Sequence, residues 1–236
     1  MNTWVVLPAA GVGSRMESSV PKQYMRLQGH YLIDQTLKLF INQPYFRNII
    51  VVLSPDDEYW QDALFCGHPA VIRADGGAER ADSVLAGLLK IEQEALADDW
   101  VLVHDVARPC LTQTDLERLL AIQKSEACGG LLAAPVRDTM KRSSDAFNMQ
   151  YGQCVDHTVS RDNLWHALTP QMFRYQDLVD ALTSARNSET PITDESSAME
   201  LAGYKPVLVK GSVRNIKVTY PEDLELAHFY LNQDTI

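Results

Sequence analysis

Two cationic side chains follow a loop of small residues near the beginning of the chain. The loop is Pro8-Ala-Ala-Gly11-Val-Gly13-Ser-Arg15-Met16, and Lys22 comes shortly afterwards in Pro21-Lys22-Gln-Tyr24. Glycine and alanine let backbone N–H groups approach an anion closely, and an arginine and a lysine supply the positive charge that a polyphosphate requires. Because an apolar, β-branched run precedes the loop, the spacing predicts a strand that leads into a phosphate-binding loop.

Two common phosphate loops fit this stretch poorly. The dinucleotide-binding pattern G-x-G-x-x-G/A requires a small residue where this chain has Met16. The Walker pattern requires Gly-Lys-Ser/Thr, which the stretch lacks. A simpler alternative stays open at this point, in which the glycines form a turn and both cations are solvated.

A second group of residues that could take part in a reaction lies later in the chain. Asp105 ends a predicted strand over residues 100–105 and is followed by Arg108. Open parallel sheets usually place their chemistry at the carboxyl ends of their strands, so these side chains are candidates for a site. Arg80 follows two glycines that open a predicted helix, whereas Lys217, on local grounds alone, would be an exposed strand lysine.

The hydrophobic pattern predicts alternating strands and helices. Apolar β-branched runs indicate strands that are buried on both faces, and a period near 3.6 indicates amphipathic helices. Strands are expected at 48–54, 70–73, 100–105, 130–136, 205–209 and 215–219, and helices at 33–42, from about 57, across 84–91, at 113–126, at 176–186, from about 193 to 203 and from about 221. Thr193 is expected to cap the helix near 193, with Asp194 and Glu195 suiting its dipole. This order predicts an α/β fold with a mostly parallel, doubly wound sheet, in one domain over residues 1–236.

The segment over residues 137–161 interrupts this alternation. It is extended and polar at its start, loop-like in the middle, and alternating again at its end. We expect a long β-hairpin arm that projects from the sheet. Because an isolated hairpin is marginally stable in water, we predict that the arm packs against a second copy in a homodimer.

Charge and composition restrict the kinds of partner. The 236 residues carry a formal net charge of −10, which argues against a nucleic-acid-binding surface. No apolar run approaches the length of a membrane span. Cys66, Cys110, Cys128 and Cys154 are scattered, without a C-x-x-C pair or a leader-like segment before them. This pattern favours unpaired thiols and a cytoplasmic location.

The chain also resembles a known family along nearly its whole length. The blocks that carry the resemblance are Pro8 to Met16, Pro21-Lys22-Gln-Tyr24, Gly76-Gly-Ala-Glu-Arg80-Ala-Asp-Ser83-Val, Val103-His-Asp105-Val-Ala107-Arg108-Pro109, Ala134-Pro-Val-Arg-Asp-Thr139, Thr158-Val-Ser-Arg161, Thr169-Pro-Gln171, Thr193-Asp-Glu195 and Asn215-Ile-Lys217-Val-Thr219. Together they resemble the 2-C-methyl-D-erythritol 4-phosphate cytidylyltransferases. The resemblance implies a Rossmann-like nucleotidyltransferase fold and a dimer joined by the arm. It also implies transfer of the cytidylyl group of CTP to 2-C-methyl-D-erythritol 4-phosphate, with release of pyrophosphate.

The same resemblance implies roles for individual residues. Arg15, Lys22 and Lys217 would be the catalytic cations around the reacting phosphates. CTP would contact Pro8, Ala9, Ala10, Gly11, Gly13, Gly77, Ser83, Asp105 and Ala107. The sugar phosphate would contact Asp105, Arg108, Thr139, Arg161, Thr169 and Thr193. Mg²⁺ or another divalent cation would be held mainly by the phosphates of CTP, with Asp105 as a candidate ligand.

Several alternatives stay open on the residues themselves. A ribitol 5-phosphate cytidylyltransferase would share the loop and the arm, and a regulatory nucleotide-binding module would keep the fold without the reaction. Arg80 could be an ion-pair residue rather than a binding residue. Asp105 and Thr193 could serve only as caps. We expect His104 to satisfy a buried hydrogen bond rather than to transfer a proton, because the attacking phosphate is already ionised.

Overall fold

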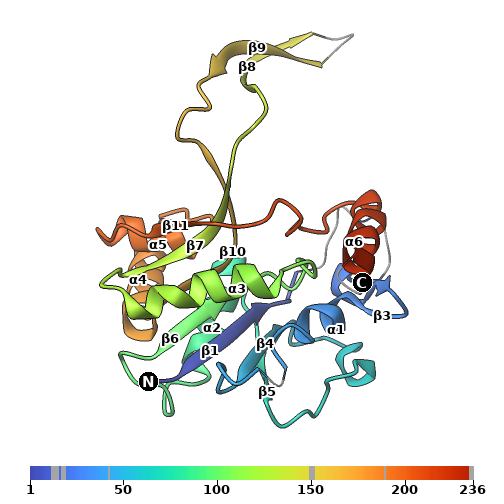
Figure 1. The fold of residues 1–236 in the computed structure, drawn as a ribbon, viewed down its shortest axis with the longest axis vertical. Helices are drawn as coiled ribbons and strands as arrows, with labels where there is room; N and C mark the ends of the chain where they lie inside the picture. Colours follow the sequence, from blue (N-terminus) through green and yellow to red (C-terminus); the bar gives the residue numbers. More distant parts are fainter. Residues whose placement is uncertain (12–15, 17–19, 42, 149–151, 189, 234–236) are drawn as a thin grey trace.

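The computed structural model describes residues 1–11, 16, 20–41, 43–148, 152–188 and 190–233, with the backbone alone at 146–148. The predicted mostly parallel sheet is confirmed: seven strands pair in the order β11-β7-β10-β6-β1-β4-β5 (Figure 1). They are β1 (Thr3–Pro8), β4 (Ile49–Leu53), β5 (Val71–Asp75), β6 (Trp100–Val103), β7 (Gly129–Pro135), β10 (Trp165–Arg174) and β11 (Val207–Lys210). Strand β10 runs antiparallel between β6 and β7, and the other pairings are parallel.

Helices cover both faces of the sheet, which explains its apolar strand sequences. In β1, Val5 and Leu7 pack on the face covered by α1 and α3, while Trp4 and Val6 pack on the face covered by α2, α4 and α5. The helices are α1 (Leu32–Leu37), α2 (Arg80–Leu89), α3 (Gln113–Leu120), α4 (Tyr175–Asn187), α5 (Glu195–Leu201) and α6 (Pro221–Gln233). In the part of the chain that the structure describes, no helix is both long and apolar enough to cross a bilayer.

The arm expected at 137–161 contains two antiparallel strands, β8 (Met140–Asn148) and β9 (Gly152–Val159). They form a separate two-stranded sheet that stands away from the body of the molecule (Figure 1). Most described side chains of β9 are exposed, including Val155 at 61%.

The helix expected from about Asp57 is wrong. The segment contains only a short 3-10 turn, η3 (Trp60–Asp62), and the backbone is extended at Ala63. The carboxylate of Asp57 accepts hydrogen bonds from the backbone N–H groups of Tyr59 and Trp60. Such local side-chain bonds compete with continued helical bonding, so the turn does not extend.

The strand expected at 215–219 is also wrong. This segment is irregular, and its polar groups bond to the loop that follows β6 and to Thr169 within β10. The backbone N–H of Val218 donates to the carbonyl of Ala107, and Asn215 Nδ2 donates to the carbonyl of Thr169. Val218 is buried in a third core cluster with Ala227 of α6. The segment is therefore anchored across the carboxyl ends of the strands instead of joining the sheet.

The predicted cap of α5 is displaced by one residue. Asp194, rather than Thr193, occupies the N-cap, and its carboxylate accepts the backbone N–H of Ser197 at 2.9 Å. An aspartate is at least as good a cap as a threonine, so local chemistry explains the choice. The helix ends before Gly203, which has a positive φ of 89° as expected for a glycine beyond a helix end.

Candidate active site

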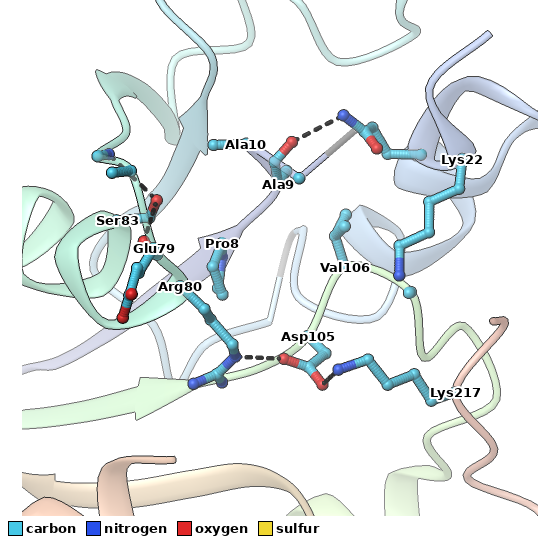
Figure 2. A pocket seen from close by; sticks show the side chains of 15 residues that line it. Pro8, Ala9, Ala10, Lys22, Glu79, Arg80, Ser83, Asp105, Val106 and Lys217 are labelled. Carbon is cyan, nitrogen blue, oxygen red and sulfur yellow. Dashed lines mark hydrogen bonds and ion pairs between the residues drawn. The ribbon is translucent and has the colours of Figure 1, made fainter. Parts of the chain in front are cut away.

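A cavity of about 170 Å³ opens at the carboxyl ends of β1 and β6, beside the first turn of α2 (Figure 2). It lies where the crossing connections of an open parallel sheet leave a crevice for ligands. Its lining residues are Pro8, Ala9, Ala10, Gly11, Lys22, Gln23, Gly77, Ala78, Glu79, Arg80, Ser83, Asp105, Val106, Ala107 and Lys217. The structure thus brings together ten residues predicted as catalytic or CTP-binding: Pro8, Ala9, Ala10, Gly11, Lys22, Gly77, Ser83, Asp105, Ala107 and Lys217.

The loop after β1 forms one wall of this cavity. Gly13 and Arg15, which were also predicted for the site, lie outside the described residues. The wall is in tight contact with the loop after β5, because a Cβ added at Gly76 would lie 2.7 Å from the Cβ of Ala10 and 2.9 Å from Ser83 Oγ. Glycine is therefore required at position 76 for the two loops to meet.

Lys22 is carried on a short 3-10 turn, η2 (Lys22–Tyr24), whose next two side chains fix its position. Gln23 is buried and donates from Nε2 to the carbonyl of Ala9 at 2.8 Å. The hydroxyl of Tyr24 donates to Asp57 Oδ2 at 2.8 Å. Sequence reasoning did not assign a role to Gln23, although the amide directly follows the predicted cation. The turn is therefore tied both to the glycine-rich loop and to the segment after β4.

The loop before α2 supplies the opposite wall. The backbone N–H of Gly77 donates to Ser83 Oγ at 3.2 Å, and the hydroxyl of Ser83 donates to the carbonyl of Glu79 at 3.1 Å. The N–H of Glu79 in turn donates to Asp82 Oδ2. These bonds hold the first turn of α2 against the loop, so the positions of Gly77 and Ser83 are fixed before any ligand binds.

Asp105 lies at the centre of the charged part of the cavity. Its Oδ1 accepts from Arg80 Nε at 2.9 Å and its Oδ2 lies 2.8 Å from Lys217 Nζ (Figure 2). Burial alone would raise the pKa of this carboxyl, but the charges of Arg80 and Lys217 outweigh burial and hold the pKa well below its usual range. The carboxylate is therefore ionised near neutral pH and orients two cations at once.

Arg80 forms a second ion pair behind the cavity. Its Nη1 and Nη2 donate to the two carboxylate oxygens of Glu195 at 2.6 and 3.1 Å. Burial opposes the charged guanidinium, yet the Glu195 and Asp105 carboxylates raise the pKa of Arg80 above its usual value. Arg80 therefore forms ion pairs with both carboxylates, and it also lines the cavity. Sequence reasoning missed Glu195 as its partner, because nothing local connects two residues so far apart in the chain.

Thr169 joins the backbone of Asp105 to the buried side chain of His104 through hydrogen bonds. The Thr169 hydroxyl oxygen accepts the backbone N–H of Asp105 at 3.0 Å and lies 3.0 Å from His104 Nδ1. His104 Nε2 lies 2.9 Å from the carbonyl of Arg108, which can only accept, so Nε2 carries the proton and Nδ1 accepts from the threonine hydroxyl. Burial lowers the pKa of His104 to about 4. The expectation that His104 satisfies a buried hydrogen bond is confirmed.

The other residues predicted to bind the sugar phosphate are not in the cavity lining. Arg108 is mostly buried and donates from Nη1 to the carbonyl of Asn215 at 2.7 Å, with Nε 3.6 Å from Asp105 Oδ2. Thr139 and Arg161 lie at the base of the arm and are exposed, and Arg161 donates to the carbonyl of Arg137. Thr193 precedes α5, where its N–H donates to Ser197 Oγ. None of these four described residues lines the cavity between β1, β6 and α2.

The described side chains do not form a metal site by themselves. No group of three or more histidine, cysteine, aspartate or glutamate side chains with suitable geometry occurs among the residues that the structure describes. Asp105 is the carboxylate at the centre of the cavity, and each of its oxygens already faces a cation. This arrangement does not fit a metal held by protein ligands alone.

Comparison with known proteins identifies the family. The family model described as 2-C-methyl-D-erythritol 4-phosphate cytidylyltransferase matches residues 3–233. The chain belongs to this family. An enzyme of that name from Vibrio vulnificus is 49% identical over 229 residues, which cover 97% of this chain and 94% of the relative. One from Escherichia coli is 47% identical over 234 residues, covering 99% and 95%.

Solved structures agree with this assignment. The crystal structure of the Francisella tularensis 2-C-methyl-D-erythritol 4-phosphate cytidylyltransferase matches with a TM-score of 0.83 at 35% identity, and the match covers 98% of this chain and all of that one. The corresponding enzyme from Thermus thermophilus matches with a TM-score of 0.76 at 29% identity. The resemblance in the sequence motifs is therefore confirmed, and the chain is a cytidylyltransferase of the nucleotidyltransferase class.

Proposed function

We propose that the cavity binds CTP and that Lys22 and Lys217 catalyse transfer of its cytidylyl group to 2-C-methyl-D-erythritol 4-phosphate. The observation that carries this proposal is the meeting of two lysines from opposite ends of the chain around one cavity lined by small residues. Membership of the cytidylyltransferase family supplies the two substrates. The products are 4-diphosphocytidyl-2-C-methyl-D-erythritol and pyrophosphate.

The reaction needs no covalent enzyme intermediate. A phosphate oxygen of the sugar phosphate attacks the α-phosphorus of CTP, a new P–O bond forms, and the bond from the α-phosphorus to the bridging oxygen breaks. The electron pair of that bond leaves with pyrophosphate. The chemical difficulty is that an anion approaches an anion while charge grows on the phosphoryl and leaving oxygens, and fixed cations reduce that cost. Lys22 and Lys217, together with Arg15, are the cations we propose for this role.

Cytosine recognition is proposed for the backbone of residues 8–11 and for Gly77 and Ser83, with Asp105 and Ala107 completing the nucleotide site. A base with an exocyclic amino group needs acceptors there, and uracil would leave those acceptors unpaired. We therefore expect turnover with UTP to be at least about a hundredfold lower than with CTP, as for other sites that discriminate by hydrogen bonding.

The sugar-phosphate site is proposed to include Asp105, Arg108, Thr169 and Thr193 from one chain and Thr139 and Arg161 from the arm of a second copy. Two features support a shared site: the arm stands away from the body, and its strands have largely exposed side chains. We accordingly propose a homodimer formed through residues 137–161. Sedimentation at micromolar concentration should give a dimer, and a monomer would overturn this part of the proposal.

A shared site also makes a complementation experiment possible. Lys217→Met and Arg161→Ala should each be nearly inactive, yet a mixture of the two variants should regain part of the activity. In a mixed dimer, one site then has Lys217 from one chain and Arg161 from its partner. A mixture that stays inactive after subunit exchange would contradict the shared site.

Mg²⁺ or another divalent cation is proposed to enter with CTP and to be held mainly by its phosphate oxygens. It would neutralise part of the triphosphate charge. Because Asp105 already faces a cation on each oxygen, we assign this residue to orienting Arg80 and Lys217. We further propose a cytoplasmic location, which is supported by four free cysteine thiols.

The direct test is release of pyrophosphate from CTP in the presence of 2-C-methyl-D-erythritol 4-phosphate. Lys22→Met and Lys217→Met should each lower kcat by about a hundredfold to a thousandfold, as does loss of other transition-state donors. Lys210→Met, at an exposed lysine that ends β11, is the matched control and should leave kcat unchanged. Ribitol 5-phosphate should be the poorer acceptor, and a preference for it would defeat the proposed substrate.

A further inference from the structure

Glu195 is a buried carboxylate that does not line the cavity. It is the first residue of α5, its exposed fraction is 0%, and both of its oxygens accept hydrogen bonds from Arg80. Burial of an unpaired charge costs desolvation free energy, and even a paired buried charge often stabilises a fold no more than an apolar side chain would. Packing alone therefore does not explain a carboxylate at this position. The pair with Arg80 is the feature that needs a functional explanation.

The geometry of the guanidinium suggests that explanation. Arginine presents its N–H donors in a rigid planar fork. Glu195 accepts one N–H from each of Nη1 and Nη2, and this anchors the guanidinium so that Nε donates to Asp105 Oδ1. Asp105 Oδ2 is then left to face Lys217 Nζ at 2.8 Å. Figure 2 shows Arg80, Asp105 and Lys217 in a row in which the carboxylate lies between the two cations.

We infer that Glu195 is a positioning residue for Lys217 and acts through Arg80 and Asp105. By anchoring the guanidinium, Glu195 fixes the position from which Nε donates to Oδ1 of Asp105, and the other oxygen of Asp105 holds the ammonium of Lys217. The inference rests on the proposed catalytic role of Lys217. It assigns to Glu195 no contact with either substrate.

The charges of the residues that link Glu195 to Lys217 agree with this role. Three cations, Arg80, Arg108 and Lys217, face the two carboxylates of Asp105 and Glu195. The cluster therefore keeps one positive charge in excess for an anionic ligand. Glu195→Gln would raise that excess and would replace a charge-assisted bidentate pair with a single neutral acceptor, so the guanidinium would be free to turn towards Asp105. Asp105 would then be drawn to Arg80 at the expense of Lys217.

The test is Glu195→Gln, with Glu200→Gln as the matched control. Glu200 lies on the same helix, is exposed, and accepts from Ser196 rather than from the cluster. Pyrophosphate release should show kcat lowered between about tenfold and a hundredfold for Glu195→Gln, as for other small displacements of catalytic groups. The KM for CTP should stay within about twofold, because among the described residues the oxygens of Glu195 bond to Arg80 rather than to the groups proposed to read cytosine, which are the backbone of residues 8–11, Gly77 and Ser83. The control should match the unmodified enzyme in both constants.

A double variant separates positioning from general damage. If Glu195 acts through Lys217, adding Glu195→Gln to Lys217→Met should lower kcat further by less than about twofold, because coupled residues are not additive. A further loss equal to that in the unmodified enzyme would overturn the inference, as would an unchanged kcat in Glu195→Gln itself. Should Glu195→Gln fail to fold, Glu195→Asp keeps the charge with a shorter reach and should show the same loss of kcat at unchanged KM.

A crystal structure of Glu195→Gln provides a readout that does not depend on activity. It should show Arg80 donating to both oxygens of Asp105 and Lys217 Nζ beyond hydrogen-bonding distance of that carboxylate. An unmoved Lys217 would contradict the positioning role even if the enzyme were slow. If instead the unmodified protein releases no pyrophosphate from CTP and the sugar phosphate, the proposed function fails, and the structural result still decides the role of Glu195.

Discussion

The hydroxyl oxygen of Thr169 lies 3.0 Å from the backbone nitrogen of Asp105 and accepts its N–H. The same hydroxyl donates its proton to the neutral imidazole of His104, so a single threonine joins a buried histidine to the carboxylate that orients Lys217. Thr169, His104 and Asp105 are buried, so loss of a hydrogen bond between them should lower the free energy of unfolding or the turnover rate, and both can be measured.

Replacing Thr169 with valine should destabilise the protein and slow the reaction. Valine keeps the shape but leaves the N–H of Asp105 and His104 Nδ1 without their partner, which should cost about 1–3 kcal/mol in the free energy of unfolding. Chemical denaturation and steady-state kinetics would measure both effects. Thr169→Ser keeps the hydroxyl and is the control. A valine variant with unchanged stability would show that the hydroxyl has no structural role.

Acid should destabilise the fold partly through His104. Its pKa is about 4 in the folded protein because it is buried, whereas the pKa of a histidine in the unfolded chain has its ordinary value of 6.5. Between these values the unfolded chain binds more protons, so stability falls as the pH is lowered from about 6.5 towards 4. The free energy of unfolding should drop by about 2 kcal/mol more for the unmodified protein than for His104→Gln between pH 7 and pH 5. Equal losses in the two proteins would show that His104 is not the group responsible.

Gly76→Ala should weaken CTP binding. The new methyl group would lie 2.7 Å from the Cβ of Ala10 and would push apart the two loops that line the cavity. Overpacking of this kind costs about 1–3 kcal/mol, and the displaced loops should raise the KM for CTP. Gly211→Ala, whose nearest contact would be 3.3 Å from Leu132, is the milder control. A KM that stays the same in Gly76→Ala would mean that the loops can separate without affecting the nucleotide.

Tyr24→Phe should loosen the turn that carries Lys22. The change removes the hydrogen bond to Asp57 and should lower the free energy of unfolding by about 1 kcal/mol. Because Lys22 is two residues away, kcat/KM for CTP should fall several-fold. Tyr45→Phe, at a half-exposed tyrosine, is the control for loss of a hydroxyl. If both variants retain full activity, the support for Lys22 comes from Gln23 rather than from Tyr24.

The strands that could be predicted from the sequence are those buried on both faces. Residues 49–53 and 100–103 have continuous apolar runs because helices cover each side of the sheet, and this burial is visible in composition alone. Strand β10 left no comparable signal. Pro170 lacks an N–H, and the register of β10 on β7 shifts between Ala167 and Gln171, so the alternation that marks a strand is interrupted.

For the site, sequence could predict the residues but not all their partners. Lys22 and Asp105 were candidates from their place after predicted strands, Lys217 only from the family resemblance, and the structure gathers all three at one cavity. It could not pair Arg80 with Glu195, which is 115 residues away, because an ion pair across the fold leaves no local periodicity. Residues 215–219 were predicted as a strand, and this was wrong. Their apolar residues are buried or partly buried, as in a strand, but they pack against α6 and lie outside the sheet.

Lys217 comes after every strand of the central sheet in the order of synthesis, and its segment is fixed by Val218 against Ala107 and by the helix that follows. The seven strands are therefore complete in the chain before the lysine that lines the cavity with them has been added. Packing of the segment that carries Lys217, together with the helix after it, is the step that brings this lysine to the cavity.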